Sequence, residues 1–163
     1  MKSKAVFDRS NPDFQYRYSL IKLWNETLPK ATVIMLNPSI ADELKNDHSV
    51  NRCLNYLIDN DYGSLEIVNL FAYIETDSKK LKTSEKYIGT ENDIYIREAI
   101  KNSETIIVAW GSDNDYKMRK KQVLSIIGNR PIKYFEDFSG RTIPTHISRL
   151  KNGFELMVYN SQF

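Results

Sequence analysis

The chain has 163 residues, of which 41% are hydrophobic and 27% are charged, and its formal net charge is +2. These values are typical of one soluble globular domain with a substantial core, so we expect residues 1–163 to form a single domain. They exclude a global electrostatic attraction to nucleic acid or to a membrane surface, and the single cysteine excludes a disulfide within the chain and a metal site built from several thiolates.

The N-terminal part of the chain is predicted to form a sheet edge and then the first buried strand. Residues 4–8 and 15–24 are typical of strands, and the turn-forming Ser10-Asn11-Pro12-Asp13 between them predicts an antiparallel pair. The nearly continuous apolar run from Ala31 to Leu36 is typical of a strand buried on both faces. Pro38 should end this strand, because proline cannot donate a hydrogen bond to a sheet ladder.

A strand–helix–strand unit is predicted to follow. Ser39 and Asp42 have the Ser-x-x-Asp spacing of a helix start. After a polar loop, Asp47 or Ser49 can cap an amphipathic helix, for which we expect Gly63 to supply a left-handed C-terminal residue. The buried stripe of this helix consists of Val50, Cys53, Leu54, Leu57 and Ile58. The apolar run 65–72 is then a second core strand, which a right-handed crossover makes parallel to the first.

The rest of the chain continues the alternation of helices and strands. Residues 74–90 are predicted to form an irregular charged loop, and Thr90 to Asp93 has capping-box spacing before a helix. Later elements are expected as a third core strand at 105–110, a helix at about 115–127 ended by Gly128, a short strand at 132–135 and an edge strand at 154–159. The predicted class is α/β, in three layers (α/β/α), with a central, mainly parallel sheet of about four core strands plus antiparallel edge strands.

A distinctive polar or aromatic group follows each of the three predicted core strands. These groups are Asn37-Pro38-Ser39, Asn69-Leu70-Phe71 and Trp110-Gly111. In a parallel sheet the carboxyl ends of the strands lie on one edge, and ligands of open α/β sheets bind there. We therefore expect the three groups to converge on one crevice, with Asn37 at its centre.

Location and cofactors are predicted from what the sequence lacks. No run is long and apolar enough for a signal peptide or a membrane span, which favours a cytoplasmic protein without membrane contact. With two histidines, one cysteine, no glycine-rich phosphate loop and no carboxylate cluster, we expect no metal and no cofactor. The absence of a glycine-rich phosphate loop and of a carboxylate cluster also weakens a third hypothesis, in which the protein is a nucleotide phosphohydrolase.

Several motifs lie in an order that is similar to a known family. They are Arg17, Met35-Leu-Asn-Pro-Ser-Ile-Ala-Asp42, Asp47, Arg52-Cys53 and Asn69-Leu-Phe-Ala72, followed by Asn92-Asp93, Ala109-Trp-Gly111 and Pro144 with His146. Together they resemble the domain-of-unknown-function 1643 family of bacteria and phages. That family usually has His-Pro-Leu in its last motif, where this chain has His146-Ile-Ser.

A more distant resemblance bears on chemistry. Asn37-Pro38-Ser39 is similar to the Asn-Pro-Gly of mismatch-specific uracil-DNA glycosylases, and Asn51-Arg52 is similar to their later Asn-Arg. Other branches of that superfamily have motifs that are similar to Asn69, to Ala109-Trp-Gly111 and to His146-Ile-Ser148 of this chain. The resemblance implies a uracil-DNA-glycosylase-like fold and, as an activity, hydrolysis of an N-glycosidic bond.

The resemblance also implies roles for single residues. Asn37 would hold the attacking water, and His146 would donate a hydrogen bond to the departing base, on which negative charge develops. Asp42 is a candidate general base, as is Asp47. The binding residues implied are Pro38, Ser39, Asp47, Arg52, Asn69, Phe71, Asn92 and Trp110, with Asn69 reading a base edge, Phe71 or Trp110 stacking on the base and Arg52 contacting phosphate.

Each of these roles has a purely structural alternative. Ser39, Asp42 and Asp47 are also the residue types that cap helices and form turns. Asn69 and Phe71 can simply end a strand and fill the core, and Trp110 is more often a core residue than a stacking platform. Cys53 falls on an apolar stripe, which is typical of a small core residue.

One concentrated basic run, Lys117-Met-Arg-Lys-Lys121, lies on a predicted helix. Lys117, Arg119, Lys120 and Lys121 are candidate contacts with a DNA backbone, although such charges are more often the solvated face of a helix.

The leading hypothesis is a nucleobase- or nucleotide-recognising protein, a candidate N-glycosidic hydrolase that acts on a nucleotide or short nucleic acid. The alternative is a non-catalytic protein that sequesters a nucleotide or reads a modified base.

Overall fold

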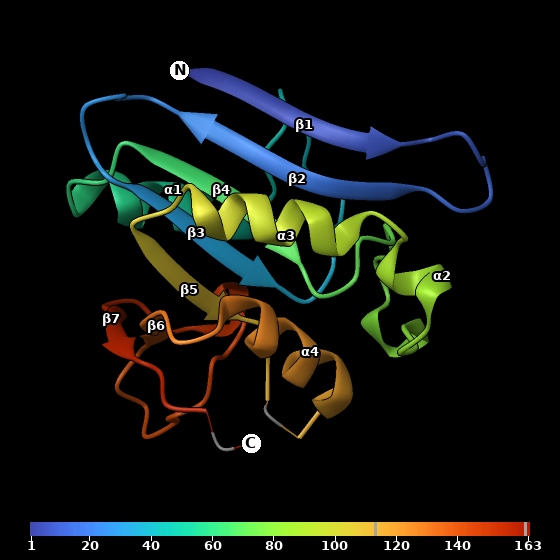
Figure 1. The fold of residues 1–163 in the computed structure, drawn as a ribbon. Helices are drawn as coiled ribbons and strands as arrows, with labels where there is room; N and C mark the ends of the chain where they lie inside the picture. Colours follow the sequence, from blue (N-terminus) through green and yellow to red (C-terminus); the bar gives the residue numbers. More distant parts are fainter. Residues whose placement is uncertain (113, 162) are drawn as a thin grey trace.

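A seven-stranded mixed sheet organises the chain, with the strand order β1-β2-β4-β3-β5-β6-β7 (Figure 1). The computed structural model describes residues 1–112, 114–161 and 163. Its strands are β1 (Lys2–Asp8), β2 (Tyr16–Leu23), β3 (Lys30–Met35), β4 (Ser64–Asn69), β5 (Thr105–Ala109), β6 (Ile132–Glu136) and β7 (Glu155–Val158). Its helices are α1 (His48–Asp59), α2 (Glu85–Ile88), α3 (Asn92–Lys101) and α4 (Lys117–Ile127), with 3-10 turns η1 (Ser78–Lys80) and η2 (Ile147–Arg149).

The centre of the sheet is parallel and its margins are antiparallel. β3 pairs in parallel with both β4 and β5, and β5 pairs in parallel with β6. β2 joins β4 in antiparallel fashion and carries β1 beyond it, while β7 lies antiparallel to β6 at the other margin. The prediction of a mixed α/β fold with a parallel core and antiparallel edge strands is therefore confirmed.

Each face of the sheet is covered by helices, because successive side chains of the core strands point to opposite faces. Val33, Ile67 and Ile107 belong to one buried cluster, which also contains the α1 stripe of Val50, Cys53 and Leu57. Their strand neighbours, Ile34, Val68 and Val108, belong to a second cluster with residues of α3 and α4. In Figure 1, α3 lies in front of the sheet and α1 lies behind it.

The helix predicted from Ser39 and Asp42 does not form. Asp42 instead accepts hydrogen bonds through Oδ1 from the backbone N–H groups of Leu44 (2.8 Å) and Lys45 (2.7 Å), which closes a turn. The aspartate side chain therefore satisfies the backbone in a non-helical conformation, a competition that this residue type often wins. The first helix begins at His48, and its cap is Asp47, whose Oδ1 accepts from Val50 N at 2.9 Å.

Three further local predictions are corrected. Thr90 to Asp93 does not form a capping box, because α3 follows Glu91, which makes no side-chain cap. Gly63 is not left-handed; a Cβ there would lie 1.9 Å from the Asn25 carbonyl oxygen, so glycine is required by a close approach of two chain segments. Ile58, predicted to lie in the α1 stripe, is 44% exposed.

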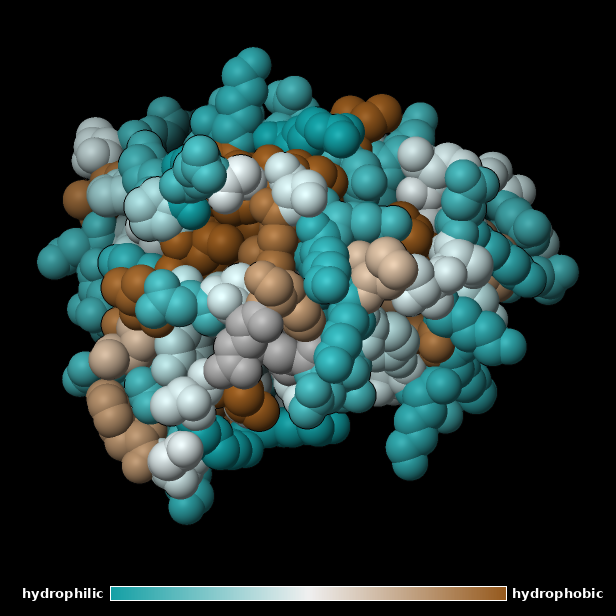
Figure 2. All heavy atoms as spheres, turned by 60° about the horizontal axis from the view of Figure 1, so that its bottom comes forward, coloured by the Kyte–Doolittle hydropathy of each residue, from teal (hydrophilic) through white to brown (hydrophobic). Residues whose placement is uncertain are grey.

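The surface is mainly hydrophilic on the face shown in Figure 2, where the largest hydrophobic area is recessed among polar side chains. None of the helices in the described part of the chain has the length and apolarity needed to cross a bilayer.

Candidate functional site

A cavity of about 710 Å³ lies at the C-terminal edge of the parallel strands. Its lining comes from the four segments that follow β3, β4, β5 and β6, within residues 36–39, 75–79, 110–116 and 141–149. This is the edge at which the sequence predicted a crevice. Among the predicted site residues, Asn37, Ser39, Trp110 and His146 line the cavity.

Asn37 enters the cavity with its amide orientation fixed. Its Nδ2 donates to the carbonyl oxygens of Pro38 (3.1 Å) and Glu75 (2.5 Å). These two acceptors use both N–H groups of the amide and so decide which way the amide points. The side-chain carbonyl oxygen, Oδ1, is the atom that remains to accept a hydrogen bond from a ligand or a water.

The hydrogen bonds of His146 determine which of its ring nitrogens carries the proton of the neutral ring. Its Nδ1 lies 2.7 Å from the Ser148 hydroxyl and accepts from the backbone N–H of Ser148 at 3.4 Å. An Nδ1 that accepts leaves the proton of a neutral imidazole on Nε2, which is then a donor. Burial lowers the pKa of His146 below its ordinary value of 6.5; Asp47 opposes this shift and Arg149 adds to it. Burial therefore favours the neutral form of the ring.

Trp110 and Thr145 form a wall of the cavity with unpaired polar atoms. Trp110 is 1% exposed and Thr145 is 6% exposed. The Trp110 ring packs edge-on against Tyr159. Within the described residues, Trp110 Nε1 and Thr145 Oγ1 have no hydrogen-bond partner. The ring of Trp110 is thus mostly core, and its buried N–H is a donor without an acceptor.

Tyr116 is a cavity residue that the sequence analysis did not identify. It precedes α4 with φ 53° and ψ 37°, a left-handed conformation that costs roughly 1–2 kcal/mol for a residue with a Cβ. Its hydroxyl donates to the Ser78 carbonyl oxygen at 2.8 Å, and its ring meets Phe71 edge-on at 5.1 Å. No local pattern signals this role, because Tyr116 lies at the start of the segment that was predicted as a helix over about 115–127.

Charged residues of both signs line the rim. The cations are Lys79, Arg141 and Arg149, and the carboxylates are Glu75 and Asp115. Arg141 is held by an ion pair of 2.8 Å with Asp137. The pKa of Asp137 lies far below its usual range because its carboxylate accepts from the Ser139 hydroxyl and from backbone N–H groups of Lys151 and Ser139. Sequence reasoning missed these residues because they lie in turns without a periodic pattern.

The other predicted site residues lie outside the cavity lining. Asp42 and Asp47 hold the turn and the helix cap described above, and Pro38 and Phe71 are buried. Arg52 points toward η2, where NH1 donates to the carbonyl oxygens of Ile147 (2.5 Å) and Leu150 (2.8 Å). It therefore supports the segment that carries His146.

Asn69 and Asn92 meet at the end of β4, outside the cavity lining. Asn92 Nδ2 donates to the carbonyl oxygens of Asn69 (2.9 Å) and Leu70 (3.2 Å). Asn69 is 1% exposed, and both polar atoms of its side chain lack a partner among the described residues. The geometry gives Asn92 a supporting position and leaves Asn69 with unused hydrogen-bonding capacity.

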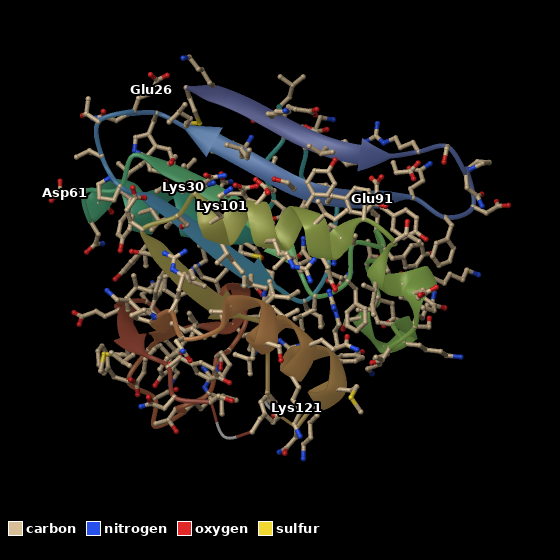
Figure 3. The ribbon with its side chains drawn as sticks, viewed as in Figure 1. Glu26, Lys30, Asp61, Glu91, Lys101 and Lys121 are labelled. Carbon is tan, nitrogen blue, oxygen red and sulfur yellow. The ribbon has the colours of Figure 1, made fainter. Side chains whose placement is uncertain are left out.

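The basic run on α4 divides into buried and exposed residues. Arg119 is 1% exposed and Lys120 is fully buried, so neither can contact a DNA backbone as predicted. Arg119 donates to the Leu70 carbonyl oxygen (2.7 Å) and pairs with Asp93 (2.6 Å), and Lys120 donates to the Ser112 carbonyl oxygen. Lys117 and Lys121 are exposed, and Figure 3 shows Lys121 on the outer side of α4.

No group of three or more His, Cys, Asp or Glu side chains that could hold a metal ion occurs within residues 1–112, 114–161 and 163.

Comparison with known proteins yields one match. Residues 17–146 match a family model described as a protein of unknown function (DUF1643). The matched range begins at buried Arg17 and ends at His146 in the cavity. No curated protein and no solved structure matches the chain.

Proposed function

The chain belongs to the DUF1643 family, whose description names no activity, and we propose from the cavity itself that the protein recognises a nucleobase or nucleotide. The observation that carries this proposal is the pairing of Asn37 with His146 in one cavity. Each of these residues has one hydrogen-bonding atom left after its contacts within the protein, an acceptor on Asn37 and a donor on His146.

A nucleobase suits this cavity in size and chemistry. Ligand pockets commonly measure about 300–1,000 Å³, combine apolar or aromatic walls with a few oriented polar groups, and lie at the carboxyl edge of α/β sheets. A base offers a flat ring with donors and acceptors along its edge, which the fixed amide of Asn37 and the oriented imidazole of His146 can distinguish. Lys79, Arg141 and Arg149 at the rim supply positive charge for a phosphate.

Hydrolysis of an N-glycosidic bond is the reaction that these two residues would support. A water held by Asn37 Oδ1 would attack the anomeric carbon, the carbon–nitrogen bond would break with its electron pair leaving on the base, and the proton lost by the water would end on the base anion through solvent. His146 Nε2–H would donate to the departing base as negative charge develops on it. We also propose that the observed α/β fold is a three-layer, uracil-DNA-glycosylase-like fold, which would suit this reaction.

Binding without hydrolysis is the second candidate, and one observation favours it. The Asp42 carboxylate accepts two backbone N–H groups in its own turn and does not line the cavity, so it is not placed to act as a general base there. In addition, Ser39 stands where the resembling glycosylases have glycine. A protein of this kind would sequester a nucleotide or read a modified base.

A binding and turnover panel tests both candidates. The protein would be titrated with nucleosides and nucleoside monophosphates by calorimetry, and incubated with uracil-, thymine-mismatch- and modified-base oligonucleotides to detect released base. We expect saturable binding of at least one of these compounds that weakens in Asn37→Ala and His146→Ala. Lys101→Ala, an exposed change on α3 outside the cavity, should bind as the wild type does.

The outcomes separate the proposals. Released base that disappears in both cavity variants supports hydrolysis, and a ligand bound and returned unchanged supports the binding protein. If no compound binds or reacts, or if binding survives both substitutions unchanged, recognition by this cavity is disproved.

A further inference from the structure

Tyr116 is the more exposed of the Trp and Tyr rings that line the described part of the cavity. Trp110 and Tyr116 are the aromatic residues of its described lining. Trp110 is 1% exposed, and Phe71, which the sequence nominated as a stacking residue, is fully buried behind the lining. Tyr116 is partly exposed and lines the cavity directly. A planar ligand in this cavity therefore has Tyr116 as its available partner.

The Tyr116 ring is held at both ends. Its hydroxyl donates to the Ser78 carbonyl oxygen at 2.8 Å, which ties the segment after β5 to η1 in the segment after β4. Its ring packs edge-on against Phe71, with the two centroids 5.1 Å apart and the planes at 70°. An aromatic side chain fixed in this way loses little conformational freedom when a second ring stacks on it.

The backbone of Tyr116 adds an independent sign of function. A tyrosine at φ 53° occupies a region that side chains with a Cβ rarely adopt. Such residues cluster at binding and catalytic sites, where the surrounding structure maintains an unfavourable conformation. Here the hydroxyl bond to Ser78 and the contact with Phe71 supply that support.

We propose that Tyr116 is the residue on which the planar ring of the ligand stacks, in the place that the sequence assigned to Phe71 or Trp110. This inference rests on the proposed recognition of a nucleobase and names the residue that binds its face. Asn37 and His146 address the edge of the base, whereas Tyr116 makes the site selective for flat aromatic ligands over sugars and aliphatic anions.

Three variants of Tyr116 separate stacking from support of the loop. Tyr116→Leu removes the ring, Tyr116→Phe keeps the ring and removes the bond to Ser78, and Tyr116→Trp enlarges the ring face. None of the three introduces a β-branched residue at this left-handed position, so the backbone cost is matched. The probes are purine and pyrimidine nucleosides, with ribose 5-phosphate as a ligand that has no planar ring. Thermal midpoints confirm that each variant is folded.

We expect Tyr116→Leu to weaken nucleoside binding by about 5- to 150-fold, the range found when a base loses an aromatic partner, and to leave ribose 5-phosphate binding unchanged. Tyr116→Phe should bind nucleosides nearly as tightly as the wild type. Tyr116→Trp should bind as tightly or more tightly, with quenching of its indole fluorescence on addition of nucleoside.

Equal nucleoside affinity in wild type and Tyr116→Leu would overturn the stacking role while leaving nucleobase recognition intact. A loss in Tyr116→Phe as large as that in Tyr116→Leu would also overturn it, since the tether to Ser78 would then be the important feature. If the wild type binds no nucleoside at all, this inference and the proposed function both fall.

Discussion

Single residues at the cavity owe their orientation to backbone carbonyl groups. Asn37 is the clearest case, because both N–H groups of its amide donate to carbonyl oxygens, those of Pro38 and Glu75. These bonds join the end of β3 to the segment after β4. The residue is therefore required for the shape of the cavity as well as for any water that it holds.

Asn37→Asp should destabilise the fold. A carboxylate cannot donate, so the Pro38 and Glu75 carbonyl oxygens would face a negative charge instead of an N–H group. We expect a loss of about 1–3 kcal/mol in the free energy of unfolding, measured by urea denaturation. The matched control is Asn55→Asp on the exposed side of α1, which should change stability by less than about 0.5 kcal/mol. Equal effects of the two changes would contradict the geometry at Asn37.

His146 should make stability depend on pH. Because burial lowers the pKa of His146 in the folded state below the ordinary value of 6.5, the unfolded chain binds a proton more readily than the folded chain does. The contribution of the neutral ring is complete above pH 6.5 and is lost as the pH falls through the folded-state pKa. Unfolding free energies measured from pH 5 to 8 should therefore rise with pH, and His146→Gln should flatten that rise. An identical profile in the variant would refute this explanation.

At the scale of individual elements, Gly63 shows how a close approach fixes where β4 begins. A Cβ on this residue would lie 1.9 Å from the Asn25 carbonyl oxygen and 2.8 Å from the Leu28 Cβ. Gly63→Ala should therefore force the backbone apart and cost about 3 kcal/mol or more. Gly140→Ala is the comparison, because Gly140 has φ 87° but open space around it, and we expect about 1–2 kcal/mol there. Thermal or urea unfolding of both variants measures the difference, and a smaller loss for Gly63→Ala would contradict it.

Helix α4 contributes through its buried cation rather than through a basic surface. Arg119 joins three elements, since it donates to the Leu70 carbonyl oxygen after β4 and pairs with Asp93 in the first turn of α3. Arg119→Met should cost about 2–4 kcal/mol of unfolding free energy, because it removes a buried charge-assisted network. Lys121→Met, an exposed change on the same helix, should cost less than about 0.5 kcal/mol. Equal losses of unfolding free energy in the two variants would contradict the prediction that the buried Arg119 stabilises the fold more than the exposed Lys121 does.

These elements also show where sequence patterns suffice. The α1 stripe and the apolar strand runs were predictable because burial imposes a period of 3.6 residues in helices and continuous apolar sequence in central strands. The false helix at Ser39 shows the limit, since a Ser-x-x-Asp spacing also suits an aspartate turn. The inward position of Arg119 and Lys120 was equally hidden, because a charged run does not show which of its members find buried carbonyl partners.

At the scale of the whole molecule, topology explains why part of the site was predictable. Parallel strands bring their carboxyl ends to one edge, so the groups at Asn37, Asn69 and Trp110 were expected together; Asn37 and Trp110 line one cavity, whereas Asn69 lies outside its lining. The strand order and the courses of the loops were not predictable from local patterns. Tyr116 and Arg141 reach the cavity through turns, one with a left-handed residue and one held by Asp137, and their placement depends on contacts between distant segments.

A crystal structure of the protein soaked with the tightest-binding nucleoside or nucleotide would show whether this cavity recognises a base. We expect a base in the cavity with its edge toward Asn37 Oδ1 and His146 Nε2 and its face against Tyr116. A ligand bound elsewhere, or an empty cavity in crystals soaked well above the dissociation constant measured in solution, would contradict this expectation.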